Sequence, residues 1–302
     1  METDPPFHEF YKSLFNKNME EKTPQTINKS DKELVIVEEC ELPLIDLSRL
    51  YLSEPERTEC KADIARASQE WGFFQVVNHG ISPEILEKMR SEQERVFKQP
   101  FDRKTKEYRY LNFSAGSYRW GTPSATSLGQ LSWSEAFHIP LSDISRSGGF
   151  DTLSCLPSTC YLRLNRYPPC PLPLEVFGLT PHTDSDFLTI LHQDQVGGLQ
   201  LVKDGRWIAV KPNPEALIIN IGDLFQAWSN GVYKSVRHRV IANPLVERFS
   251  TAYFFCPSYD TVIESCREPA VYRKFSFREY RQQIHEDVQK LGTKIGLPRF
   301  RV

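Results

Sequence analysis

The sequence of 302 residues has no run of 18 apolar residues, which argues against a membrane-spanning helix. It also lacks an excess of either charge, because 37 Lys and Arg residues face 39 Asp and Glu residues and give a net charge of −2. No basic stripe carries interleaved aromatic residues, so nucleic acid is not an expected partner. With a mean hydropathy of −0.44, the chain is expected to be soluble and to stay off membranes.

Cysteine is sparse and follows no recognisable pattern. The seven cysteines are an odd number, and none of them forms a C-x-x-C pair. This pattern favours reduced thiols over a disulfide framework. Cys155, Cys160 and Cys170 lie close together in sequence, but their spacing matches no zinc cluster, and we interpret them as structural. The first residues also lack the basic and then apolar pattern of a secretory signal, so we expect a cytoplasmic location, with the nucleus as an alternative.

No linker divides the chain into two cores, so we expect one structural unit. With 40% hydrophobic and 12% aromatic residues, the chain can bury a large core. Polar and charged residues dominate the N-terminal stretch, which predicts a loosely ordered arm. The expected segments are an arm over 1–40, an α/β region over 41–160 that packs on a barrel, the barrel over 161–265, and a C-terminal helix and tail over 266–302.

Three candidate metal ligands stand out. If 180–191 is a strand, His182 and Asp184 point to the same side. His238 follows 54 positions after Asp184, in another β-branched run, and reaches the same point only if the intervening strands curl into a closed sheet. Two imidazoles and one carboxylate on one face of an octahedron leave three open positions, which suits non-haem Fe(II). By itself H-x-D is a weak motif, more often a surface histidine beside a solvated aspartate, and Asp186 is a second candidate carboxylate.

A second pair with the same i, i+2 spacing follows His238. Arg248 and Ser250 come after an Asn243-Pro244 turn. On a hairpin that pivots there, both side chains share one inward face with His238. A planar guanidinium is suited to capture a carboxylate, so the pair predicts an acidic co-substrate that reaches both the metal and Arg248.

These motifs together resemble the plant 2-oxoglutarate- and Fe(II)-dependent dioxygenases. The resemblance includes H-x-D, the later histidine and R-x-S, and it extends to N-R-Y-P-P at 165–169, W-G-F-F at 71–74 and N-H-G at 78–80. The segments at 114–123, 195–200 and 224–231 are similar to those of the gibberellin 2-oxidases, in particular the branch that acts on C20 gibberellins. The resemblance covers most of the chain.

The resemblance implies a mainly β fold with flanking helices around a double-stranded β-helix, the jelly-roll or cupin-like core. It implies Fe²⁺ as cofactor, 2-oxoglutarate and O₂ as co-substrates, and ascorbate as reductant. The implied metal ligands are His182, Asp184 and His238. The implied 2-oxoglutarate residues are Arg248, Ser250, Tyr167 and Asn165.

The implied activity is 2β-hydroxylation of a gibberellin, which inactivates the hormone. Two alternatives remain: a related oxygenase that acts on another small molecule such as a flavonoid, and a catalytically silent isoform. The candidate substrate residues are Tyr118, Arg119, Trp120, Tyr253 and Phe255. Arg119 is the candidate for a substrate carboxylate. Equally, Trp120 and Trp133 simply anchor a long loop, and aromatic residues in barrel strands more often belong to the core.

The segment 141–160 departs from the family. Relatives usually carry a longer helical insertion here, whereas ten residues join Phe150 to the strand that begins at Tyr161. We therefore expect part of the outer helical layer to be missing, which would leave apolar surface of the barrel exposed. A splice product, an incorrect gene model and a degenerate protein each account for such a short connection.

Overall fold

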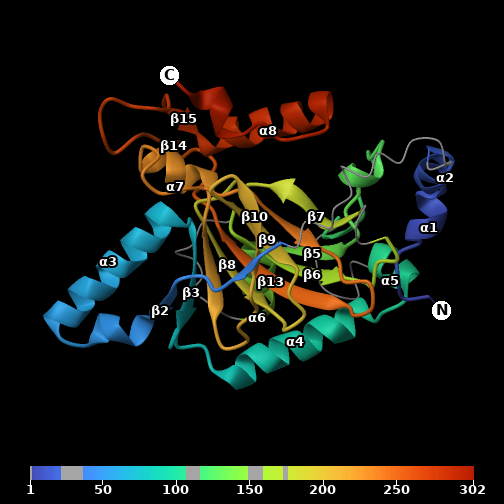
Figure 1. Cartoon of the computed structure of the whole chain (residues 1–302), viewed down its shortest axis with the longest axis horizontal. Coiled ribbons are helices and arrows are strands. Elements are labelled where there is room, and N and C mark those ends of the chain that lie inside the picture. The colour runs from blue at the N-terminus through green and yellow to red at the C-terminus, as the bar shows by residue number, and fades with distance from the viewer. Residues whose placement is uncertain (1, 22–36, 107–115, 149–158, 173–175) are drawn as a thin grey trace.

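The computed structural model describes residues 2–21, 37–106, 116–148, 159–172 and 176–302 (Figure 1). Two facing sheets form the core, as a jelly roll requires. In spatial order the larger sheet contains β2 (Leu44–Asp46), β3 (Phe73–Val77), β11 (Leu217–Ile221), β8 (Leu188–Gln193), β13 (Arg248–Phe255), β6 (Tyr161–Tyr167), β5 (Glu135–Pro140) and β4 (Tyr118–Trp120). The smaller sheet contains β1 (Glu39–Cys40), β10 (Arg206–Val210), β9 (Leu199–Lys203), β12 (His238–Ile241) and β7 (Phe177–His182). The predicted mainly β architecture is confirmed.

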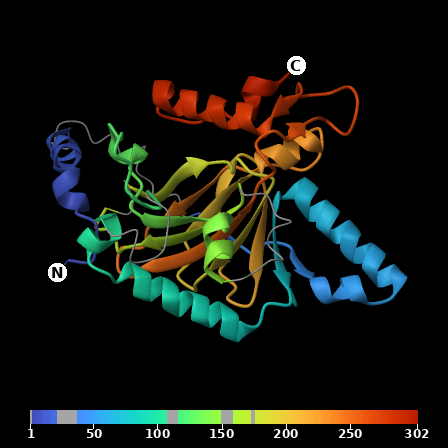
Figure 2. The same cartoon turned by 180° about the vertical axis from the view of Figure 1, so that it is seen from behind.

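Helices surround this core on several sides. The longer ones are α3 (Glu54–Glu70), α4 (Pro83–Phe97) and α8 (Phe277–Leu291). The shorter ones are α1 (Phe7–Phe10), α2 (Lys12–Glu21), α5 (Phe101–Lys106), α6 (Leu141–Gly148) and α7 (Asp223–Trp228). Figures 1 and 2 show α4 beneath the strands, α3 beside them and α8 across the top. Within the described residues, no helix combines the length and apolar character needed to cross a membrane.

Side chains of the larger sheet alternate between an inner and an outer face. On β13, Phe249 packs in a cluster with residues of α4, and the Thr251 hydroxyl donates to Gln93 of α4 at 3.1 Å. Arg248 and Ser250, which alternate with these two residues along the strand, line an internal pocket together with side chains of the smaller sheet. The helix α4 therefore covers this part of the outer face, and the candidate site lies between the sheets.

Two sequence-based expectations about strand pairing are wrong. The strand expected over 180–191 is interrupted, because β7 ends at His182 and β8 begins only at Leu188. The expected hairpin between the His238 and Arg248 strands does not form: β12 pairs with β7 and β9, whereas β13 belongs to the other sheet. Asn243 turns the chain from one sheet to the other, because its side chain accepts hydrogen bonds from the N–H groups of Leu245 and Val246.

The described part of the N-terminal arm is packed, contrary to the prediction of a loosely ordered arm. Phe7, Tyr11 and Leu14 are buried, because their spacing places them on one helical face. The Phe7 ring stacks on Trp133 with 4.3 Å between centroids. The Tyr11 hydroxyl accepts a hydrogen bond from the Thr122 N–H at 2.8 Å. Apolar anchors at helical spacing thus outweigh the polar composition of the arm.

A buried ionic network ties the start of the chain to the larger sheet. Lys104 and Glu135 pair at 2.5 Å with both side chains fully buried, and Arg166 donates to Glu135 at 2.7 Å. Lys104 also donates to the carbonyl of Thr3, and Arg166 donates to Asp4. The first residues therefore satisfy buried cations, and this makes them part of the folded unit.

An apolar row on the outer face of the larger sheet is incompletely covered. Ile219, Ile190, Tyr253 and Leu162 are neighbours across four strands, and each is only partly buried. The residues that flank this row in register, Phe74 and Ile139, are buried. The described helices therefore bury the ends of the row more completely than its centre, as expected if part of the outer layer is missing. Residues 149–158, at the short connection, lie outside the described part.

Replacing Phe7 with Ala should lower the free energy of unfolding by about 3 kcal/mol, because the change removes a buried aromatic ring. Urea denaturation followed by circular dichroism measures this loss. The matched control is Phe10→Ala, since Phe10 is 54% exposed. Equal, small effects of the two substitutions would show that the arm contributes nothing to stability.

Candidate metal centre and co-substrate pocket

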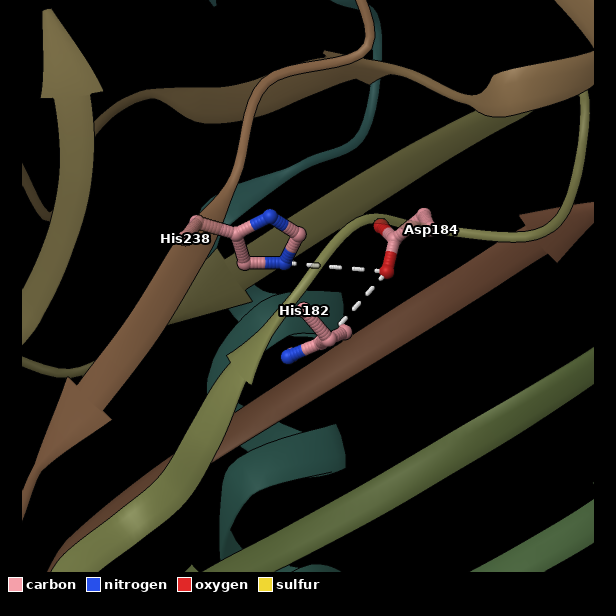
Figure 3. Close-up of side chains that lie close together, drawn as sticks. All are labelled: His182, Asp184 and His238. Carbon is pink, nitrogen blue, oxygen red and sulfur yellow. Dashed lines mark ion pairs between the residues drawn. The ribbon is translucent and has the colours of Figure 1, made fainter. Parts of the chain in front are cut away.

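His182, Asp184 and His238 gather at one point between the sheets (Figure 3). His182 ends β7 and His238 begins β12, and the two residues are directly paired in register. Asp184 comes from the loop that follows β7. The Oδ1 atom of Asp184 lies 3.5 Å from Nε2 of His182 and 3.6 Å from Nε2 of His238. One potential ligand atom from each residue lies within 4.8 Å of the other two.

Backbone carbonyls orient both imidazole rings. Nδ1 of His182 lies 2.7 Å from the carbonyl oxygen of Thr180, and Nδ1 of His238 lies 3.1 Å from that of Val236. Because a carbonyl only accepts, each Nδ1 carries the proton and each Nε2 presents a lone pair to the common point. Burial and the neighbouring His182 lower the pKa of His238 to about 4, so this ring is neutral near pH 7.

The Asp184 carboxylate is oriented by two donors. Its Oδ2 atom accepts from the Thr189 hydroxyl at 2.6 Å and from the Asn220 side-chain amide, which leaves Oδ1 facing the histidines. Burial opposes ionisation, but His238, His182 and the Thr189 hydroxyl outweigh it and hold the pKa of Asp184 below its usual range. Thr189 and Asn220 were not predicted from the sequence, although both lie on inward-facing positions of adjacent, paired strands.

The start of α7 holds the loop that carries Asp184. The N–H of Asp223 donates to the carbonyl of Asp184, and the N–H of Leu224 donates to that of Asp186, each at 3.0 Å. A Cβ atom on Gly222 would lie 2.1 Å from the Asp186 carbonyl oxygen, so only glycine allows this approach. The conformation of the metal loop is thus determined by residues almost forty positions further along the chain.

The C-terminal tail also holds this loop. Lys294 donates to the carbonyl of Thr183 at 2.9 Å and to the Ser185 hydroxyl at 2.8 Å, and it pairs with Asp223. No sequence motif marks this lysine, because its contacts to the loop span more than one hundred positions. The start of α7 and the C-terminal tail therefore hold the loop together.

Asp186 is not part of the donor group. Its carboxylate accepts from the Thr189 hydroxyl at 3.2 Å, and burial together with the adjacent Asp184 raises its pKa well above the usual value. Among the described residues, the group able to hold a metal contains Asp184 and not Asp186. The structure therefore resolves the choice between the two carboxylates in favour of Asp184.

The donor set fits a ferrous ion. Two neutral imidazole nitrogens and one carboxylate oxygen converge from one side, and the facing side opens into the pocket. This arrangement of two histidines and one carboxylate leaves coordination positions for other ligands, as non-haem Fe(II) oxygenases require.

An unpaired buried cation lies in the same pocket. Arg248 is 2% exposed and donates through one NH₂ group to Gln193 at 2.7 Å. Its Nε and NH1 atoms are buried without a hydrogen-bond partner. The guanidinium lies over the Tyr167 ring, 4.9 Å from the centroid. Because an unpaired buried charge is costly, the site fits an anionic ligand such as the far carboxylate of 2-oxoglutarate.

The other predicted co-substrate residues adjoin Arg248. The Asn165 amide donates to the Ser250 hydroxyl at 3.3 Å, and the Asn165 Oδ1 atom is buried without a partner. Tyr167 packs beneath Arg248, and its predicted hydrogen bond to the co-substrate stays a prediction. The pocket is lined by Phe73, Arg163, Asn165, Tyr167, Leu179, His182, Asp184, Thr189, Leu191, Leu199, Asn220, His238, Val240, Arg248, Ser250, Ala252 and Phe254.

None of the five predicted substrate residues lines this pocket. Tyr118 donates its hydroxyl to the buried Glu135 carboxylate and so belongs to the ionic network. Trp120 packs against Phe7 and Phe101, which makes it an anchor for the arm. Arg119 is exposed on the edge strand β4, although its register through Ala136 to Asn165 places it on the inner side of the sheet.

Tyr253 and Phe255, the two predicted substrate residues on β13, do not face the pocket. Tyr253 and Phe255 alternate with the inward-facing residues of the strand, and the pocket contains Phe254 instead. The period of two, counted from Arg248, already predicts Phe254 as the inward residue. Arg163 also lines the pocket and was not predicted. Because it precedes Asn165 by two positions on one strand, the two side chains share the inner face.

Comparison with known proteins identifies the class of this enzyme. Residues 158–257 match the model of the 2OG-Fe(II) oxygenase superfamily, and residues 42–148 match that of the non-haem dioxygenase in morphine synthesis N-terminal region. The crystal structure of JOX2 in complex with 2OG, Fe and JA is similar, with a TM-score of 0.66 and 30% identity over 88% of this chain and 91% of that chain. The chain is a 2-oxoglutarate-dependent dioxygenase.

Curated relatives define the family more closely. Gibberellin 2-beta-dioxygenase 8 of Arabidopsis thaliana is 60% identical over 98% of both chains. Gibberellin 2-beta-dioxygenase 6 of Oryza sativa subsp. japonica is 49% identical over 87% of this chain and 85% of its own. The chain belongs to the gibberellin 2-beta-dioxygenase family of the 2OG-Fe(II) oxygenases.

The comparison also shows that the chain is short for its family. The alignment with the Arabidopsis relative spans 335 positions, although this chain has 302 residues. At least 33 positions of that relative therefore have no counterpart here. The two matched family regions are separated by residues 149–157. These residues lie in the segment 141–160, which is expected to lack a helical insertion that relatives carry.

Isothermal titration with Mn(II) should show one site in the wild type and no measurable binding to an Asp184→Ala variant. Thr189→Val should weaken Mn(II) binding about 10- to 100-fold, because it removes a donor that orients the ligand carboxylate. Asp186→Asn is the matched control and should bind almost as tightly as the wild type. Loss of binding in Asp186→Asn with retention in Asp184→Ala would reverse the assignment of the ligand.

Proposed function

We propose that this enzyme hydroxylates gibberellins at C-2β and thereby inactivates them, with C20 gibberellins as the preferred substrates. The observation that carries the proposal is the placement of a His182, Asp184 and His238 group opposite an unpaired Arg248 in one pocket. Support for the substrate comes from curated relatives that are gibberellin 2-beta-dioxygenases over nearly the whole chain. The C20 preference is supported by the three sequence segments described above.

The pocket residues divide into two binding groups. His182, Asp184 and His238 would hold Fe²⁺ through Nε2, Oδ1 and Nε2. Arg248 and Ser250 would hold the far carboxylate of 2-oxoglutarate, with Asn165 and Tyr167 supporting them. When bound, iron and 2-oxoglutarate supply O₂ activation: one oxygen atom converts a substrate C–H to C–OH, and the other enters succinate as CO₂ leaves.

The protein supplies position rather than acid or base catalysis. No proton has to be removed by a side chain, so the C–H bond held nearest the metal determines the product. Apolar residues of both sheets line the space beside the metal ligands and exclude water from it, with Leu199 and Val240 on the smaller sheet and Phe254 on the larger one. Selectivity for C-2 thus depends on how the substrate is anchored.

We also propose a cytoplasmic location. The six cysteines in the described part of the chain are all free thiols, as expected in a reducing compartment. Four of them are buried and serve as small core residues: Cys60, Cys160, Cys170 and Cys256.

The purified protein, incubated with Fe(II), 2-oxoglutarate, ascorbate and a C20 gibberellin, should release succinate and a 2β-hydroxylated product identified by mass spectrometry. Succinate formed only with another small molecule, such as a flavonoid, would contradict the substrate assignment. The absence of succinate with every substrate would indicate a silent isoform.

Arg248→Gln should raise the KM for 2-oxoglutarate about 30- to 100-fold, because the co-substrate carboxylate loses its buried cationic partner. Its affinity for Mn(II) should stay unchanged. Arg206→Gln is the control, since Arg206 is exposed at the start of β10. An unchanged KM in Arg248→Gln would refute the assigned role.

A further inference from the structure

Arg163 is a second cation in the pocket that the co-substrate does not explain. It lies on β6 two positions from Asn165, pairs in register with Ala252, and lines the pocket that contains the metal ligands. Its Nε atom is buried without a hydrogen-bond partner. In the described ranges of the chain, no carboxylate forms an ion pair with it. A guanidinium in this setting lacks the anion that would offset its burial.

Arg119 and Arg281 are two further arginines whose charges affect His138, the neighbour of Arg163. His138 of β5 is paired in register with Arg163. Burial lowers the pKa of His138 to about 3, and the charges of Arg163, Arg119 and Arg281 lower it in that order. Arg119 lies on the inner side of the edge strand, and Arg281 projects from α8. Both are exposed, and neither forms an ion pair with an acidic residue of the described chain.

An apolar surface lies next to these cations. The Tyr161 ring stacks on Phe254 with 4.6 Å between centroids and on His138 with 5.7 Å. Phe254 and Arg163 both line the pocket. The combination of flat apolar rings and unpaired guanidinium groups is complementary to a rigid hydrophobic molecule that carries a carboxylate.

The Arg163 site is separate from the Arg248 site. Arg248 is paired in register with Tyr167, four residues along β6 from Arg163. At about 3.3 Å per residue, the two positions are about 13 Å apart along the strand. One carboxylate does not bridge positions so far apart, so the two arginines serve different acid groups.

We propose that Arg163 binds the carboxylate of the substrate, with Arg281 and Arg119 adding positive charge nearby. This inference rests on the proposed function and deepens it, because it states which feature of a gibberellin the enzyme recognises. Arg163 makes the principal contact, since it alone of the three lines the pocket. The anchored acid then determines which C–H bond faces the metal.

The test compares a gibberellin acid with its methyl ester in wild type, Arg163→Gln and Arg163→Lys. Arg163→Gln should raise the KM for the acid about 30- to 100-fold, because a buried charge-assisted contact is lost. Arg163→Lys should recover part of this loss. The ester should bind poorly to the wild type and should be almost insensitive to the substitution. The KM for 2-oxoglutarate should stay unchanged, because the co-substrate carboxylate is assigned to Arg248.

Two variants on α8, Arg281→Gln and Arg278→Gln, test whether Arg281 contributes to binding of the substrate carboxylate. Arg281→Gln should raise the KM for the acid by a smaller factor than Arg163→Gln. Arg278→Gln should leave it unchanged, because Arg278 is exposed and paired with Asp260. Equal effects of Arg281→Gln and Arg278→Gln would remove Arg281 from the site.

Calorimetry on the Mn(II)- and 2-oxoglutarate-loaded protein separates the two proposals. If the acid binds in an Arg163-dependent way without turnover, the carboxylate site stands and the proposed function fails. If gibberellin is hydroxylated but Arg163→Gln weakens acid and ester equally, the proposed function stands and the carboxylate site is refuted. A raised KM for 2-oxoglutarate alone in Arg163→Gln would assign the residue to the co-substrate and would also refute the proposal.

Discussion

The structure depends on a small set of directional hydrogen bonds that fix three donor atoms at one point. The carbonyls of Thr180 and Val236 hold the two imidazole rings by their Nδ1 atoms, and Thr189 and Asn220 hold one oxygen of Asp184. Together these bonds leave one donor atom of each of the three residues directed at the same point. The jelly roll supplies the framework, because adjacent strands bring the two histidines together and the opposite sheet supplies Thr189 and Asn220.

Each sheet carries a different part of the binding site. The smaller sheet carries the histidines, and the larger sheet carries Arg248, Ser250 and Arg163 on its inner face. A co-substrate held between them contacts metal on one side and guanidinium on the other. Since both walls are hydrogen-bonded sheets, the separation between the metal ligands and the cation is set before any ligand binds, and little reorganisation is needed.

Local sequence patterns account for much of this arrangement. The remainder depends on pairing between residues that are distant in sequence, which such patterns do not reveal. At the start of α8 the Ser276 hydroxyl accepts from the Glu279 N–H, and Gly292 ends the helix at a positive φ that favours glycine. Asp204-Gly205 forms a hairpin turn with φ of 49° and 77°. The sheet switch at Asn243 was missed, because a turn motif does not reveal which strand comes next in space. The metal ligands were predicted through their family motif, whereas Thr189, Asn220 and Lys294 act through contacts that no short motif records. The prediction that Tyr253 and Phe255 contact the substrate was wrong, because it relied on their aromatic character and not on the alternation of side chains along the strand.

The central claim is that one ferrous ion and one 2-oxoglutarate bind together between His182, Asp184, His238 and Arg248. The most direct measurement is an anaerobic titration of the Fe(II)-loaded protein with 2-oxoglutarate, followed by the visible charge-transfer absorption of a 2-oxo acid that chelates ferrous iron. We predict a band that saturates at one equivalent, is absent in Asp184→Ala, and needs much higher 2-oxoglutarate in Arg248→Gln. A wild-type protein without the band, or an equal band in Asp184→Ala, would contradict the account.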